Sequence, residues 1–173
     1  NYKYMACPLT QNYALKDCLT PAGVASWYIT PFSNMLTAVM TSNVVTTITK
    51  TVAFKTIAQE IEQGSWSYTG TSSQPNGSHA FDFEAIIKMH QLNTLDQEEI
   101  TLILKNKCVL IAVMQNGDAW MLGREFGTNG IDSKFESGTA LGDFMGTNLT
   151  VKGRATQAAK KVDPAILAGL LTP

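Results

Sequence analysis

The sequence predicts a mainly β protein: an antiparallel β-sandwich or barrel with one flanking α-helix, a long hairpin loop and extended terminal arms. Segments rich in β-forming residues recur along the chain and are separated by turn-forming residues. One segment has a helical pattern, whereas a parallel sheet would need several crossover helices. The 173 residues suffice for one domain. We place that domain at residues 23–154, between an N-terminal arm at 1–22 and a C-terminal arm at 155–173.

Composition favours assembly over nucleic-acid binding. Apolar residues make up 45% of the chain and charged residues 16%, against roughly 25% charged residues in a typical soluble domain. A surface poor in charge fits strands that meet other protein. The net charge is −1, from 13 basic and 14 acidic residues, so no basic footprint for gripping phosphates is expected. A weakly charged wall would still let nucleic acid pass without sticking.

The sequence lacks the patterns of a membrane span and of a signal peptide, and this indicates the compartment in which the protein folds. The longest apolar runs, such as residues 109–114, fall far below the roughly 18 to 20 residues of a membrane span, and no signal-peptide pattern begins the chain. We therefore expect a soluble protein folded in a cytoplasm. Three cysteines, Cys7, Cys18 and Cys108, do not suggest an oxidised framework. Cys7 and Cys18 could pair, but free thiols are the favoured interpretation.

The N-terminal residues lack a clear period, and Pro8 and Pro21 discourage regular structure around them. An arm has little core of its own in which to bury aromatic rings, so docking onto a neighbouring subunit would bury them. The candidate contacts in this arm are Tyr2, Tyr4 and Tyr13. Beyond Gly23 a strand-like stretch begins, and Pro31 predicts an edge or bend.

The next segments are predicted to form long strands. Residues 43–57 are almost all β-formers, and the alternation puts Val45, Thr47 and Thr49 on one face. Neither face of the expected strand is clearly polar. Residues 70–79 are turn-formers and predict a long exposed hairpin loop, with a return strand at 80–90. The strands before and after this loop would supply further contacts. The candidate assembly contacts from residues 43–70 are Val45, Thr47, Thr49, Phe54, Trp66 and Tyr68.

The second half carries the one predicted helix, at residues 94–105, where Thr94 and Gln97 have capping-box spacing. A buried strand at 107–114 and its partner at 119–124 should be joined by a tight turn containing Asn116-Gly117. The glycine-containing stretch at 126–146 reads as flexible, and a final strand is expected at 147–154.

No residue set predicts catalysis, a cofactor or a metal. The histidines and cysteines do not stand at ligand spacing, no serine lies in a GxSxG elbow, and the glycines do not follow a phosphate-binding pattern. His79 and His90 are interpreted as polar residues at the two ends of a strand. Cys108 is interpreted as a small buried hydrophobe. We therefore expect a non-enzymatic protein.

Three segments resemble small virion proteins of tailed bacteriophages that infect Bacteroides-type bacteria: MACPLT at 5–10, VLIAVMQNGDAWMLG at 109–123 and SGTALGDFMGTNLTVKG at 137–153. The resemblance covers most of residues 5–153 and is closest to tail tube subunits. Such subunits combine a β-sandwich or barrel with a flanking helix, a protruding loop and arms. They form rings, commonly sixfold, that stack into a conduit for DNA ejection.

By this resemblance the chain would be a virion protein of the tail, assembled in the host cytoplasm, whose partners are its own copies and other tail proteins. Strands at 43–57 and 59–90 would supply the inner wall and the contacts between rings. The family tends to have an acidic lumen, yet no strand here carries a row of carboxylates. The alternatives are a head–tail connector or terminator, a capsid-decorating protein, and a carbohydrate- or receptor-binding module.

Overall fold

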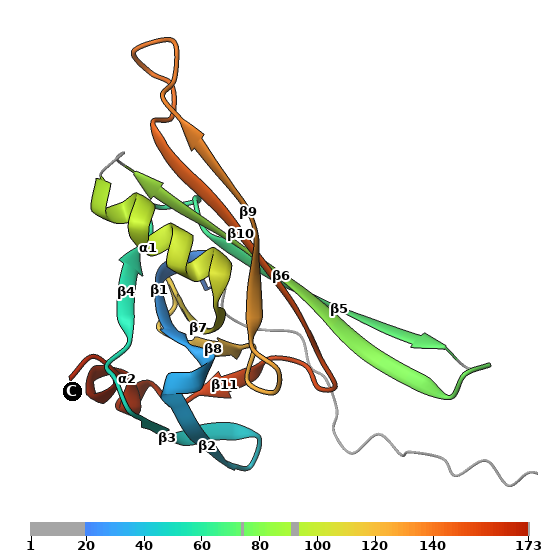
Figure 1. Cartoon of the computed structure of the whole chain (residues 1–173). Helices are drawn as coiled ribbons and strands as arrows, with labels where there is room; N and C mark the ends of the chain where they lie inside the picture. The colour runs from blue at the N-terminus through green and yellow to red at the C-terminus, as the bar shows by residue number, and fades with distance from the viewer. Residues whose placement is uncertain (1–19, 74, 91–93, 173) are drawn as a thin grey trace, which may run out of the picture.

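A computed structural model describes residues 20–73, 75–90 and 94–172, and it confirms a mainly β protein (Figure 1). All eleven strands belong to one connected sheet. The strands are β1 (Val24–Pro31), β2 (Met35–Thr41), β3 (Val44–Lys50), β4 (Lys55–Ala58), β5 (Ser65–Ser73), β6 (Ser78–His90), β7 (Lys107–Met114), β8 (Ala119–Leu122), β9 (Thr128–Glu136), β10 (Gly146–Ala155) and β11 (Lys160–Val162). The helices are α1 (Thr94–Lys105), the short α2 (Leu167–Leu170) and two 3-10 turns at Phe32–Asn34 and Pro164–Ile166.

The sheet forks at β7. One edge of β7 pairs with β1, which in turn pairs with β4. Because a strand has two edges, β8 and β9 share the other one: β8 pairs with residues 110–113 and β9 with residues 107–108. From this fork one branch runs β8-β11-β3-β2 and the other runs β9-β10-β6-β5. Among the strands of the described residues, every pairing is antiparallel except that of β11 with β3. The sheet is open, and a closed sandwich or barrel stays a prediction.

Two hydrophobic cores lie on opposite faces of β7. Cys108, Leu110 and Ala112 pack into the first core with residues of β6, β10 and α1, such as Ile87 and Ile100. Val109 and Ile111 point the other way and pack into the second core with residues of β3, β8, β11 and α2. Alternate side chains of a strand point to opposite faces, so a strand between two cores must be apolar at every position.

The predicted strand at residues 43–57 is wrong, because the chain turns at residues 51–54 and forms two strands. β3 pairs with β2 and β11, whereas β4 pairs with β1. Phe54 anchors the turn in the second core, and its N–H donates to the Leu170 carbonyl. The two strands therefore belong to different parts of the sheet and form no single wall.

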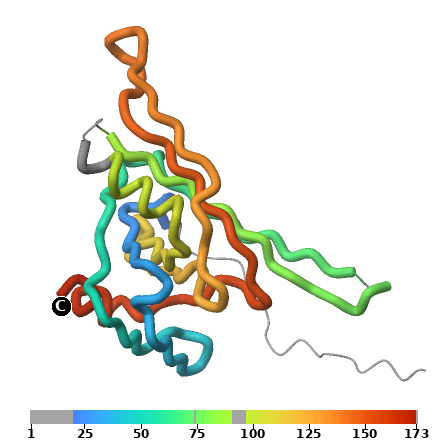
Figure 2. Tube along the Cα trace, in the orientation of Figure 1, coloured from blue at the N-terminus to red at the C-terminus, as the bar shows by residue number. Residues whose placement is uncertain are grey.

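The predicted hairpin loop at residues 70–79 is also wrong. Strands β5 and β6 continue to Ser73 and Ser78, so the turn between them is short. β10 ends opposite Phe81. Residues 71–73 and 75–80 therefore extend beyond the rest of the sheet as a two-stranded ribbon, which projects far from the body of the molecule (Figure 2). The return strand predicted at 80–90 is confirmed within β6.

The stretch at residues 126–146 is not a loop throughout, because its first half forms β9. This strand pairs with β10 along most of its length, and Ile131 forms a bulge in the pairing. The two strands make a second projecting hairpin whose tip is residues 137–145 (Figure 1). Gly130 lies under α1, where an added Cβ would meet the Leu104 side chain at 2.9 Å. The added Cβ would also lie 3.1 Å from the Leu104 Cα, so a larger residue would crowd the backbone of α1.

The C-terminal arm predicted at residues 155–173 is wrong for the described residues, because they complete the fold. β11 lies between β3 and β8 in the sheet, and Val162 is fully buried. Leu170 of α2 also packs into the second core. The N-terminal arm predicted at 1–22 lies almost wholly outside the described residues. The helix at 94–105, the strands β7 and β10 and the turn at Asn116-Gly117 are as predicted.

Candidate functional site

The β9-β10-β6-β5 branch, called here the four-strand unit, is the most exposed part of the sheet. Within the described residues, β5 pairs with β6 and leaves its other edge open over nine residues, Ser65–Ser73. None of these residues is charged or a proline. Natural proteins normally protect a long edge strand with charges, prolines or bulges. An edge without such protection is suited to pairing with another strand.

The opposite margin of the four-strand unit is also open. β9 pairs with β7 at two residues, Asn129 and Thr128, and from Gly130 to Glu136 its outer edge has no partner strand among the described residues. α1 covers the core side of this region, where Ile100 and Ile103 pack against the first core. The unit therefore offers two different free edges, one on β5 and one on β9.

The side of the four-strand unit that faces away from the core is called here the polar face. Phe83, Ala85 and Ile87 of β6 point into the first core, so their neighbours point outward. Pairing of β6 with β10 and of β10 with β9 sets these outward residues in rows across the strands. The Asp, Glu, Lys and Arg residues of the polar face are Asp82, Glu84, Lys88, Asp132, Lys134, Glu136, Lys152 and Arg154.

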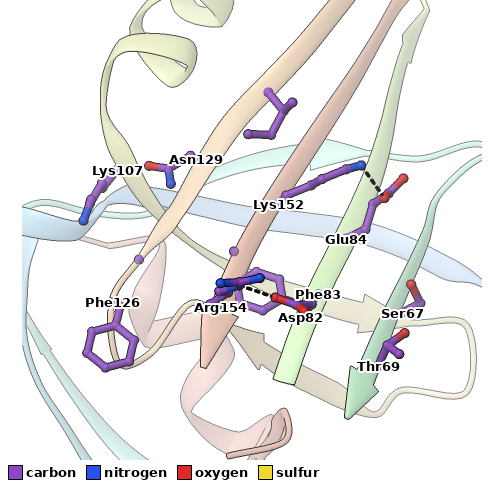
Figure 3. Close-up of a pocket in the computed structure, with 13 residues that line it drawn as sticks. Ser67, Thr69, Asp82, Phe83, Glu84, Lys107, Phe126, Asn129, Lys152 and Arg154 are labelled. Atoms are coloured by element: carbon purple, nitrogen blue, oxygen red, sulfur yellow. Dashed lines mark hydrogen bonds and ion pairs between the residues drawn. The ribbon is translucent and has the colours of Figure 1, made fainter. Parts of the chain in front are cut away.

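Six of these eight charges are joined in three ion pairs, two of them across neighbouring strands. Arg154 of β10 contacts Asp82 of β6 at 2.6 Å, and Lys152 contacts Glu84 at 2.9 Å (Figure 3). Lys134 and Glu136 of β9 are 2.6 Å apart. The hydrogen bond from Lys134 lowers the pKa of Glu136, and the same contact raises the pKa of Lys134. The polar face is thus charged but locally neutral.

A groove of about 560 Å³ follows the polar face beside the loop between β8 and β9. Its floor carries the two cross-strand pairs, together with Ser67 and Thr69 of β5 (Figure 3). Lys107 lies at its margin and forms no ion pair among the described residues. Phe126 is 55% exposed on the same margin. The groove is broad and polar, and its carboxylates, Asp82 and Glu84, are partly exposed and paired with cations.

The tip of the β9–β10 hairpin is ordered by one carboxylate. Asp143 accepts hydrogen bonds from the N–H and hydroxyl of Thr139 and from the N–H of Ala140, at 2.8 to 2.9 Å. These bonds, with the Ala140 N–H first, lower the pKa of Asp143. Leu141 at this tip is fully exposed, and Met145 is half exposed. The tip therefore presents apolar side chains on a fixed loop.

The predicted assembly contacts differ in burial: some are covered within the monomer and others are exposed. Val45 and Phe54 are buried in the second core, so the monomer itself covers them and they are not free contacts. Thr47 and Thr49 are exposed. The prediction that Val45 shares their face is wrong, because Thr46 has no partner in the register with β2, and this bulge reverses the alternation. Tyr2, Tyr4 and Tyr13 lie outside the described residues.

Trp66 and Tyr68 of β5 are half buried rather than free. Their rings are 6.1 Å apart edge to face, Tyr68 stacks on Phe83 at 4.8 Å, and Trp66 lies 5.9 Å from Trp120. Burial raises the pKa of Tyr68. These rings tie the base of the β5–β6 hairpin to the first core. They act as an anchor for the open edge, a role that the sequence pattern did not reveal.

The residues weighed for catalysis are not brought together. Cys108 is buried in the first core, as predicted, and burial raises the pKa of its thiol to about 11. His79 and His90 lie at opposite ends of β6, where they contact Phe81 and Phe144. Within residues 20–73, 75–90 and 94–172, no group of three His, Cys, Asp or Glu side chains is arranged to hold a metal ion. None of the described helices is long and apolar enough to cross a membrane.

Comparison of the chain with models of protein families, with curated proteins and with solved structures gave no match.

Proposed function

We propose that the chain is a structural subunit that assembles with its own copies into rings, which stack as the tail tube of a bacteriophage. The observation that carries the proposal is the four-strand unit, whose two margins are open edges of different strands, β5 and β9. Different edges meet head to tail, and a head-to-tail contact closes into a ring when its rotation permits. Pairing between copies would also protect an edge that otherwise invites aggregation.

The number of strands fits such a closure. β5, β6, β10 and β9 alternate in direction. Because each copy contributes an even number of strands, β5 of one copy is antiparallel to β9 of the next. The alternation then continues around the ring without a break. A continuous wall of antiparallel strands follows, with the first cores outside it and the polar face turned toward the lumen.

In this arrangement the protein works as a passive conduit, and stability comes from contacts between subunits rather than from chemistry. The partners are copies of the chain, other tail proteins and DNA in transit, and the site of action is the virion after assembly in the host cytoplasm. The resemblance of residues 109–123 and 137–153 to tail tube subunits supports these details. The exposed apolar tip at Leu141 supports a contact between successive rings.

Disulfide trapping tests the edge contact. In a background with Cys7→Ser and Cys18→Ser, Lys134→Cys on β9 is combined in turn with Ser67→Cys, Thr69→Cys or Thr71→Cys on β5. These margins are separated by two strands, about 14 Å at ~4.8 Å per strand, which is too far for a disulfide within one copy. Oxidation of the assembled protein should give a ladder of covalent oligomers for at least one of the three combinations.

The matched control pairs Lys134→Cys with Thr47→Cys, an exposed position on β3. The proposal predicts no ladder for this control. A ladder in the control alone would place the subunit contact on β3 and reject the continuous wall. If all four proteins remain monomeric after oxidation, copies of the chain do not meet at these edges.

A further inference from the structure

The polar face contains enough basic residues to bind a nucleic acid, yet three of the four, Lys134, Lys152 and Arg154, pair with a carboxylate. Lys88, Lys134, Lys152 and Arg154 are matched by an equal number of acidic residues on the same face. Binding to a phosphate backbone draws its free energy from counterions that Lys and Arg displace. A cation that already pairs with a carboxylate displaces few counterions.

The pairs are built by the register of the sheet. Lys152 stands directly opposite Glu84, and Arg154 stands directly opposite Asp82. Side chains at opposed positions of an antiparallel pair are about 5 Å apart at Cβ, so each cation meets its carboxylate without a change in the backbone. The acidic partners are 40% and 44% exposed, so both charges of each pair remain at the surface. A phosphate that approaches the cation therefore meets the carboxylate at the same distance.

We propose that these cross-strand pairs hold the basic side chains of the polar face away from phosphate, so that a nucleic-acid backbone passes along this face without binding. That a nucleic acid passes along this face rests on the proposed function. The absence of binding, however, is a property of a single chain. This mechanism differs from repulsion by an acidic wall. Because the paired charges cancel, the face neither attracts nor repels a polyanion at distances longer than the separation of the two charges in a pair. Lys107 lies at the margin of the groove and forms no ion pair with the described residues, so its charge is not neutralised.

The test is to remove the carboxylates and keep the cations. The double variant D82N/E84Q frees Lys152 and Arg154 with little change in side-chain size. Binding of a 30-base-pair duplex is measured by fluorescence anisotropy as a function of salt. We expect the variant to bind at least tenfold more tightly than the original chain at 50 mM salt. Its log–log salt dependence should be steeper by about 2, close to one unit for each freed cation.

A control variant separates pairing from overall charge. E60Q/E62Q removes two exposed carboxylates before β5 and raises the net charge by the same two units, but leaves the polar face intact. It should bind DNA no better than the original chain. Adding K152Q/R154Q to D82N/E84Q should abolish the gained affinity. Circular dichroism and thermal unfolding establish that each variant is folded before binding is compared.

Three results would overturn the inference. Equal gains for D82N/E84Q and E60Q/E62Q would show that net charge governs binding. Failure of folded D82N/E84Q to bind would show that the pairs mask nothing. Tight binding by the original chain would show that its polar face is a binding surface. None of these measurements requires the chain to form a ring. The edge contact of the proposed function is therefore tested separately, by the disulfide experiment.

Discussion

Strand β7 is almost wholly apolar, whereas the outer part of the β5–β6 hairpin is made largely of Ser, Thr and Gly, and the two lie in opposite surroundings. From Cys108 to Ala112 every residue of β7 is at most 3% exposed, because a core lies on each face. In β5, Thr69 to Ser72 are all exposed, and the outer edge has no partner among the described residues. β7 therefore supplies folding stability, and the hairpin supplies the surface that we propose for assembly.

This difference teaches that strand formation and burial are separate outcomes. β7 is a strand because both of its faces bury apolar area, at about 25 cal/mol per Å². The distal hairpin is a strand because its backbone pairs, and its exposed Ser and Thr side chains add no core. An isolated two-stranded hairpin is marginal in water. The aromatic contacts of Tyr68 at the base of the hairpin would favour the extended form. A strand from another copy, paired along the edge of β5, would favour it as well.

The largest expected effect comes from cutting away a segment that belongs with β7 rather than with the hairpin. A chain ending at Ala155 lacks β11, the strand that joins β3 to β8, so the second core opens. We expect no cooperative unfolding transition in denaturant, followed by circular dichroism. A chain ending at Leu171 keeps β11 and Leu170 and should unfold like the full chain. A normal transition in the shorter chain would return residues 156–173 to the status of an arm.

The next effect measures β7 directly. Ile111→Ala removes three carbons from a side chain that is fully buried in the second core. Such a change costs about 2 to 5 kcal/mol of unfolding free energy, from lost burial and the cavity left behind. Equilibrium urea unfolding gives this value. The exposed Val39→Ala on β2 is the control and should change stability by less than about 0.5 kcal/mol. A loss below about 1 kcal/mol for Ile111→Ala would contradict the double core.

Shortening the hairpin should leave folding stability nearly unchanged and abolish assembly. Residues 71–80 are replaced by Asn-Gly, a two-residue turn that closes the pair Gly70 and Phe81. The first and second cores are untouched, so we expect an unfolding free energy within about 1 kcal/mol of the original. Assembly should be lost, as measured by sedimentation velocity. If assembly survives unchanged, the ribbon plays no part in contacts between copies.

The smallest effect concerns the other projecting hairpin. Asp143→Ala removes the carboxylate that orders residues 137–145, so the amides of Thr139 and Ala140 should exchange faster with solvent. The pKa of Asp143 is lowered, so its contribution is complete above the usual pKa of an aspartate and is lost as pH falls through the lowered value. Amide protection factors by NMR, measured at pH 6 and at a series of lower pH values, report both effects. Asp132→Ala should leave these two amides unchanged.

The sequence predicts the elements in which local pattern and burial agree. α1 shows a helical apolar stripe, β7 is a continuous apolar run, and Asn116-Gly117 supplies the turn, where Gly117 has φ +84°. The alternation in the first half of β6 likewise reflects one face on a core. Each of these signals arises within a single segment, so no knowledge of the partner strand is needed.

The missed elements depend on partners that lie elsewhere in the chain. The ribbon and β9 carry polar residues and glycines, because their outward sides do not meet a core, so alternation is absent. β11 has three residues and is a strand because β3 and β8 flank it. The bulge at Thr46 reverses the side-chain alternation of β3 and breaks the predicted face. The pairing of charges on the polar face follows from register, which one segment cannot specify.

Negative-stain electron microscopy of the purified protein over a range of concentrations tests assembly most directly. The account predicts rings at low concentration and, as concentration rises, hollow tubes with a regular axial repeat. Closed rings that never stack would favour a head–tail connector over a tail tube. Small, uniform particles at every concentration would contradict assembly through the free edges of β5 and β9, and would leave a decorating or ligand-binding role.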